Sequence, residues 1–193
     1  MKNNTFTGAD YLLLLLYLNK CAPIKSAVRL TKMMFIFEKE IVPLLKQQGL
    51  TIDKLPEFIP YNYGPFSKDV YEQVELFQSI SFIRVQDLYR DSEDMDEVDD
   101  WEESAFIDEL SENESAYSRK SDGKYLKYSL IKRGQDYVIS EIVPFFSAEQ
   151  LDLLGQFKKR ITDTSVKAIL KYVYTKYPSM IEKSLIKKEV LGN

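Results

Sequence analysis

The side chains of this chain that could do chemistry are mostly carboxylates, and they are concentrated in one tract. Thirteen Asp and Glu residues lie between Asp91 and Glu114, with no Lys or Arg among them. Outside the tract 26 basic side chains face 17 acidic ones, a net charge of +9, although the whole chain carries −4. Such a tract could gather a divalent cation, but it lacks the Asp-x-Asp-x-Asp-Gly frame with a closing Glu that shapes a calcium loop. We therefore expect a solvated, mobile loop and no metal site.

Histidine, the commonest acid–base catalyst and metal ligand, is absent from the chain. Its absence excludes His-based acid–base catalysis and the Ser-His and Cys-His nucleophile pairs. The seven glycines are too dispersed for a phosphate-binding loop, and Cys21 is expected to be a small residue near a helix end. We therefore expect no catalytic residue and no cofactor. An enzyme that uses carboxylates and a metal is kept as a third hypothesis.

The elements that must position these side chains are predicted to be mostly helices. Apolar residues recur every three or four positions in seven segments, which is typical of helices with one buried face. These segments lie at about 11–18, 26–43, 66–77, 134–143, 151–161, 166–174 and 178–191. The first is apolar all round, so we expect it to be buried.

Capping residues indicate where several of these helices begin. Thr7 with Asp10 forms a variant of the capping box ahead of the first helix. Ser147 with Gln150 forms another ahead of the fifth, and Thr164 is expected to cap the sixth. These local signals predict where the helices start, but not how they pack.

The second helix is predicted to be amphipathic. Its basic residues fall off the apolar stripe, which indicates a polar face: they are Lys25, Arg29 and Lys32. Pro43 is expected to end or kink this helix. Residues 49–60 are interpreted as a connector, and Pro65 is expected at the first position of the third helix.

Two β-prone segments, 82–90 and 124–131, are predicted to form the arms of one antiparallel hairpin. The acidic tract would then be an insertion at its tip, at about 91–118, which costs little because loop-closure entropy grows only slowly with length. The predicted fold class is α+β, mainly α with a small antiparallel β-hairpin. We expect a winged-helix-like domain at 1–146 and a C-terminal helical extension at 147–193 that packs on it.

Four segments of the chain carry a family resemblance. They are RLTKMMFIFE at 29–38, PYNYGPFSKDVY at 60–71, YSLIKRG at 128–134 and YTKYP at 174–178. Together they resemble the YwgA-like bacterial proteins and, more distantly, the SocA-like or Panacea antitoxin-associated domain. The resemblance implies a helical or winged-helix fold and, for the antitoxin branch, neutralisation of a toxin through protein contact. The acidic insertion departs from the family's pattern.

These observations favour a non-catalytic interaction module, antitoxin-like or regulatory. Its expected partner is a protein such as a toxin or a defence component, bound by the Tyr-Gly-Pro turn and the adjacent grooves. The expected partner-binding residues are Tyr61, Asn62, Tyr63, Gly64, Pro65, Lys68 and Tyr71.

The alternative is a winged-helix regulator that binds duplex DNA, with the acidic insertion as an internal competitor. The third helix would read bases poorly because its charges, Lys68 with Asp69, Glu72 and Glu75, sum to −2. Contact is expected instead through a basic wing arm and the C-terminal helices. The expected residues are Arg119, Lys120, Lys124, Lys127, Lys132, Arg133, Lys167 and Lys171.

The composition also bears on location and assembly. The longest uninterrupted apolar run has eight residues, whereas a bilayer span needs roughly 20, so no membrane partner is expected. A lone cysteine fits a reducing compartment, and we expect a cytoplasmic protein. The apolar first helix and the aromatic-rich last third are compatible with a symmetric homodimer.

Overall fold

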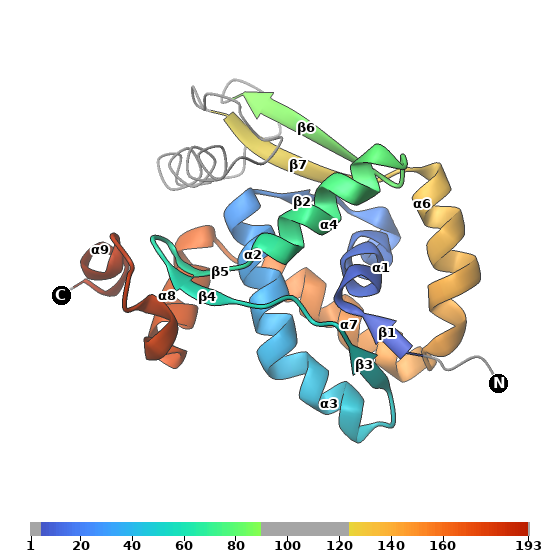
Figure 1. Ribbon diagram of the computed structural model, residues 1–193, viewed down its shortest axis with the longest axis horizontal. Coiled ribbons are helices and arrows are strands. Elements are labelled where there is room, and N and C mark those ends of the chain that lie inside the picture. The colour runs from blue at the N-terminus through green and yellow to red at the C-terminus, as the bar shows by residue number, and fades with distance from the viewer. Residues whose placement is uncertain (1–4, 90–123, 193) are drawn as a thin grey trace.

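The protein is seen in a computed structural model that describes residues 5–89 and 124–192. Within these ranges it is a mainly helical α+β protein with three small sheets. Figure 1 shows helix α1 (Gly8–Cys21) among the other elements, with the three-stranded sheet along one side, α6 (Lys132–Tyr137) at one end and α8 (Val166–Lys176) towards the other. The acidic tract, Arg119 and Lys120 lie outside the described residues.

Helix α1 forms the centre of the core. Its capping box is confirmed: Asp10 N donates to Thr7 Oγ1 at 3.3 Å, and Thr7 N donates to Asp10 Oδ2 at 2.9 Å. The predicted burial is also confirmed, because every leucine from Leu12 to Leu16 is fully buried. No helix in the described part of the chain has the length and apolar character that crossing a membrane requires.

Helix α2 (Ala27–Ile36) is buried on all sides, so the prediction of a polar face is wrong. Arg29 donates from Nη1 to the carbonyl oxygens of Ile161, at 3.1 Å, and Thr162. Lys32 donates from Nζ to the carbonyl oxygen of Pro65 at 2.9 Å. Periodicity placed both cations on a solvated face, but backbone carbonyls from distant segments solvate them inside the protein instead.

The helical backbone also passes Pro43 without ending. A wide π-helical turn, η1 (Phe37–Ile41), follows α2 and leads into α3 (Val42–Gln47), with Val42 N bonded to Phe37 O. The wider turn accommodates a proline, which lacks an N–H and would clash with the carbonyl four residues earlier.

The same arrangement recurs near Pro144. The π-helical turn η2 (Val138–Ile142) precedes the short 3-10 helix η3 (Val143–Phe145), and Val143 N bonds Val138 O. The sequence Glu-Ile-Val-Pro stands at both places, 40–43 and 141–144. The same four-residue sequence is therefore accompanied by a π-helical turn at both places.

The predicted hairpin is confirmed. Strands β6 (Ile83–Tyr89) and β7 (Lys124–Leu130) pair antiparallel, with Ile83 opposite Leu130 and Tyr89 opposite Lys124. The short strand β2 (Ile24–Lys25), which lies between α1 and α2, pairs with the other edge of β7. Helix α4 (Lys68–Ser79) contacts β6 beside this sheet.

The segment expected to be a plain connector contains strands. Strand β3 (Thr51–Asp53) pairs in parallel with β1 (Thr5–Thr7), and β4 (Ile59–Tyr61) pairs antiparallel with β5 (Gly64–Phe66). Pro65 therefore lies in a strand, and α4 begins three residues later, after Ser67. A proline is tolerated at this place because the two-stranded sheet leaves one edge of each strand unpaired.

The C-terminal segments pack on α1 and α2. Helix α7 (Ala148–Thr162) opens with the predicted capping box, in which Gln150 N donates to Ser147 Oγ at 3.2 Å. The cap of α8 is Ser165 rather than Thr164, whose hydroxyl donates to the carbonyl of Arg160. The continuous last helix is also wrong: a 3-10 turn, η4 (Pro178–Ile181), precedes a short α9 (Lys187–Leu191).

Candidate protein-interaction surface

The Tyr-Gly-Pro motif forms a tight β-hairpin. In it Tyr61 of β4 lies opposite Gly64 of β5, which leaves Asn62 and Tyr63 as a two-residue loop. Gly64 has a φ of +84°, a conformation that residues with a Cβ rarely adopt. The motif was expected to be a turn into a helix, and its strand pairing fixes the loop more firmly than a turn alone would.

Gly64 also allows the hairpin to pack closely against α8. A Cβ atom at this position would lie 2.8 Å from Cε1 of Tyr174, a residue of α8 that is fully buried. The hydroxyl of Tyr174 in turn lies 2.7 Å from Oγ of Ser184, in the segment after η4. The hairpin is thus seated on α8 and tied to the C-terminal segment.

Lys32 supports the hairpin from α2. Its side chain is fully buried and its ammonium group donates to Pro65 O, in the centre of β5. A hydrogen bond donated by a buried ammonium group is strong, because the donor is charged and water does not compete for the acceptor. Sequence reasoning missed this residue, although a lysine inside the almost wholly apolar stretch 30–37 was a usable signal.

Above this support the hairpin presents apolar and aromatic side chains. Tyr61, Asn62 and Tyr63 are partly exposed. Ile59, which shares a face of β4 with Tyr61, is 45% exposed, and Leu185 is 72% exposed. The backbone N of Leu185 donates to the carbonyl of Asn62 at 2.8 Å, which fixes Leu185 beside the loop. We call Ile59, Tyr61, Asn62, Tyr63 and Leu185 the hairpin surface.

The other predicted partner-binding residues are not part of the hairpin surface. Gly64 and Pro65 are buried beneath the loop, where they shape it. Tyr71 is 2% exposed, and its hydroxyl donates to Ala27 O at 3.2 Å, so it joins α4 to α2 in the core. Lys68 is exposed at the start of α4, with its Nζ 3.3 Å from Glu72. The structure thus brings together three of the seven predicted residues, at the loop itself.

The residues predicted for DNA contact are scattered. Lys127 is half-buried on β7, and nothing is described of the Lys124 side chain. Lys132 pairs with Asp136. Arg133 donates to Ile80 O at 3.0 Å and lies over the ring of Phe82. Lys167 and Lys171 are exposed one turn apart on α8.

A second polar cluster surrounds Glu40 in η1. Its Oε1 accepts hydrogen bonds from the hydroxyls of Tyr172, at 2.7 Å, and Tyr177, at 2.8 Å, and lies 3.0 Å from Nζ of Lys176. Burial raises the pKa of Glu40, but these donors outweigh burial and hold the pKa below its usual range. The same cluster raises the pKa of Lys176. These opposite shifts keep both groups charged, as in a structural ion pair rather than a proton-transfer site.

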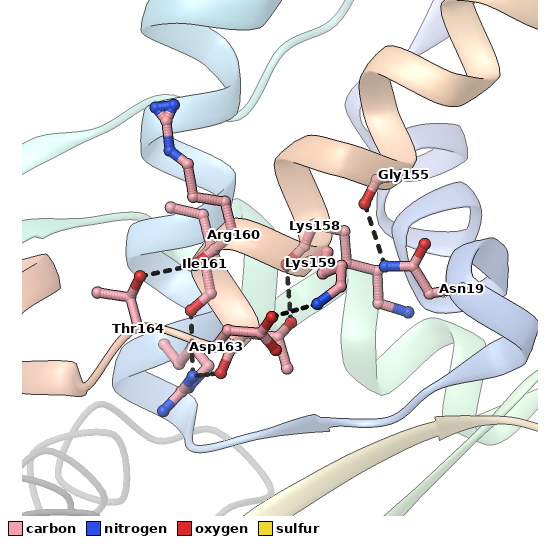
Figure 2. A network of polar contacts seen from close by, with 10 residues as sticks. Asn19, Gly155, Lys158, Lys159, Arg160, Ile161, Asp163 and Thr164 are labelled. Carbon is pink, nitrogen blue, oxygen red and sulfur yellow. Dashed lines mark hydrogen bonds and ion pairs between the residues drawn. The ribbon is translucent and has the colours of Figure 1, made fainter.

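A third network holds the end of α1 and is drawn in Figure 2. Asn19, Lys20 and Cys21 are successive left-handed residues, and Nδ2 of Asn19 donates to Gly155 O at 3.1 Å. The buried Lys158 donates to Leu18 O at 2.8 Å and Ala22 O at 2.6 Å, on both sides of this segment. Burial lowers the pKa of Lys158 to about 8, although the nearby Cys21 opposes the shift.

None of these clusters is a metal site. Across residues 5–89 and 124–192, no three His, Cys, Asp or Glu side chains are grouped so that they could hold an ion. The acidic tract for which metal binding was considered lies outside those ranges.

The fold and the hairpin surface define a mainly helical α+β protein in which exposed apolar side chains flank a tight β-hairpin loop. No protein-family model matches the chain, and no curated protein and no solved structure matches it either. The resemblance to the YwgA-like proteins therefore depends on the four sequence segments alone.

Proposed function

We propose that the chain is a non-catalytic interaction module, antitoxin-like or regulatory, that binds a protein partner through the hairpin surface. The observation that carries this proposal is the exposure of Leu185 and Ile59 beside two partly exposed tyrosines. Exposed apolar groups that gather around aromatic residues are typical of the anchors of protein interfaces.

The support beneath the surface favours the same function. The loop is held by strand pairing, by Lys32 and by the contact of Gly64 with Tyr174. A preformed surface loses less conformational entropy on binding than a flexible one. The exposed apolar groups are therefore presented in a conformation that is ready to bind.

We further propose that the core is a winged helix. The order α1, β2, α2, α4, β6, β7 is the order that such a core requires, with η1, α3 and β3 to β5 inserted between α2 and α4. The hairpin lies beside α4, and β2 pairs with the far edge of β7. The resemblance to antitoxin-associated domains agrees with this proposal. A protein partner such as a toxin or a defence component is the corresponding expectation.

The DNA-binding alternative has weaker support. Arg133 and Lys132 are engaged within the chain, and α4 presents Asp69 and Glu72 beside Lys68. Lys167 and Lys171 are the exposed pair that could contact phosphates. We expect any duplex binding to be non-specific and to weaken steeply as salt rises.

The test is co-purification of the tagged protein with the products of neighbouring genes, followed by calorimetry of any complex. Leu185→Asp should weaken a complex at least tenfold, because it places a charge in the apolar contact. Leu44→Asp is the matched control, since Leu44 is also exposed, at 42%, but lies on α3.

The two variants distinguish the outcomes. A complex that loses affinity with Leu185→Asp and keeps it with Leu44→Asp supports the proposal. A complex that both variants leave unchanged shows that the partner binds elsewhere. If no neighbouring gene product binds and the protein instead binds duplex DNA in low salt, the alternative replaces the proposal.

A further inference from the structure

An apolar groove lies on the opposite side of α8 from its contact with Gly64. It has a volume of about 470 Å³ and lies between η1, α7 and α8. Its apolar lining includes Leu153, Phe157 and Ile161, four residues apart along α7, with Ile36, Ile41 and Ile169 from the other walls. This volume lies within the range of about 300–1,000 Å³ that small-molecule sites occupy.

Several charged side chains around the groove already have partners within the protein. Glu40 lines one wall, but its carboxylate is neutralised by Lys176 and two tyrosine hydroxyls. Lys159 and Asp163 pair with each other at 2.7 Å. Asp152 accepts a hydrogen bond from Gln156, another lining residue, at the far end of the α7 stripe.

Arg160 is a cation at the groove that takes part in none of these contacts. It is exposed and lines the groove, and in the described ranges its guanidinium group has no hydrogen bond or ion pair. Figure 2 shows the guanidinium group pointing away from the network of carbonyls around Ile161 and Asp163. A positive group therefore lies beside the apolar stripe of α7, seven residues after Leu153, and an anion there would complete its hydrogen bonds.

We propose that this groove binds an amphiphilic carboxylate, a molecule with one unbranched apolar chain and one carboxylate group. The carboxylate accepts hydrogen bonds from Arg160, and the chain lies along Phe157 and Leu153 between α7 and α8. From Arg160 back to Leu153 the groove follows seven residue steps of α7, about 10 Å at 1.5 Å per residue. An extended chain of about eight carbons has a comparable length.

The test is calorimetric titration of the full chain with sodium octanoate below its micelle concentration. We expect one site per chain, and a dissociation constant at least tenfold higher for octylammonium, which has the same chain length and the opposite charge. Arg160→Gln should weaken octanoate binding by about tenfold and remove the preference for the anion. Arg84→Gln, which removes an exposed arginine of β6, is the matched control and should change nothing.

A second variant tests the groove independently of charge. Ala168 is exposed and lines the groove, so Ala168→Phe should fill it without entering the core, and octanoate binding should be lost with the circular dichroism spectrum unchanged. Anionic lipid vesicles, in which the chains are held in a bilayer, should not bind.

Each remaining outcome overturns the proposal. Equal affinity for octanoate and octylammonium, several weak sites, or binding that survives Ala168→Phe shows that the groove is not the site. Vesicle binding that Arg160→Gln abolishes shows that the anion belongs to a membrane surface instead. None of these results depends on the hairpin surface, so they leave the proposed function untouched.

Discussion

Lys32 and Pro65 are joined by a hydrogen bond of 2.9 Å between a fully buried ammonium group and the backbone carbonyl in the centre of β5. This contact ties the hairpin surface to α2. Lys32→Met keeps the length of the side chain but removes the donor, so the hairpin should open locally more often. We expect hydrogen exchange of the amides at 59–66 to become about tenfold faster or more, measured by mass spectrometry.

The control for this variant is Lys68→Met, which removes an exposed lysine near the hairpin. It should leave exchange at 59–66 unchanged. If Lys32→Met speeds exchange equally in α1 and in the hairpin, the contact stabilises the whole protein and not the hairpin in particular.

Gly64→Ala should destabilise the protein through two effects. The backbone has a φ of +84°, and the added Cβ would approach the ring of Tyr174 to 2.8 Å. Together these should lower the free energy of unfolding by about 2–3 kcal/mol, measured by urea denaturation.

Gly49→Ala isolates the backbone effect. Gly49 has a φ of +87°, and in the described part of the chain an added Cβ would have no atom within 4 Å apart from those of its own residue and its two chain neighbours. It should cost about 1 kcal/mol. Equal losses in the two variants would show that Tyr174 moves aside at little cost.

Lys158 should make stability depend on pH above neutrality. Burial lowers its pKa from 10.5 to about 8. Below pH 8 the lysine is charged in both the folded and the unfolded protein, and the fold bears the full cost of burying the charge. Between pH 8 and 10.5 the unfolded protein binds more protons, so the contribution of Lys158 to the free energy of unfolding rises with pH.

The measurement compares the wild type with Lys158→Met by urea denaturation at pH 7.5, 8.5 and 9.5. The difference in unfolding free energy should move in favour of the wild type by roughly 2 kcal/mol across this range. A constant difference would show that the pKa of Lys158 is not lowered in the folded protein.

Glu40→Gln should separate charge from hydrogen bonding in the cluster on α8. The amide keeps an acceptor for the hydroxyls of Tyr172 and Tyr177 but loses the ion pair with the partly exposed Lys176. We expect a loss of about 1 kcal/mol or less at pH 7, because solvent screens this pair.

The loss should depend on pH in the acidic range. The pKa of Glu40 is held low in the folded protein, so the stability that it contributes is present above its ordinary pKa and disappears as pH falls through the folded value. Denaturation of wild type and Glu40→Gln at successively lower pH should therefore converge. A gap that persists in acid would show that the substitution acts through packing.

Local signals in the sequence predicted several elements correctly. The capping boxes at Thr7 and Ser147 depend on atoms three residues apart, and the hairpin arms depend on alternation within each strand. The Tyr-Gly-Pro loop was also recognisable as a candidate contact, because a glycine between aromatic residues and a proline indicates a tight turn. These features are encoded by neighbours in the chain, so sequence alone was sufficient.

The sequence by itself therefore determined the mainly helical α+β class, the starts of α1 and α7 and the loop of the hairpin surface. Tertiary structure decided which charges are buried and which apolar groups are exposed. Three buried cations bind carbonyls that lie between 33 and 140 residues away: Arg29, Lys32 and Lys158. Leu185 contacts the loop from the segment between η4 and α9. Whether such a side chain is in water or in the core depends on segments distant in sequence, and no local pattern records them.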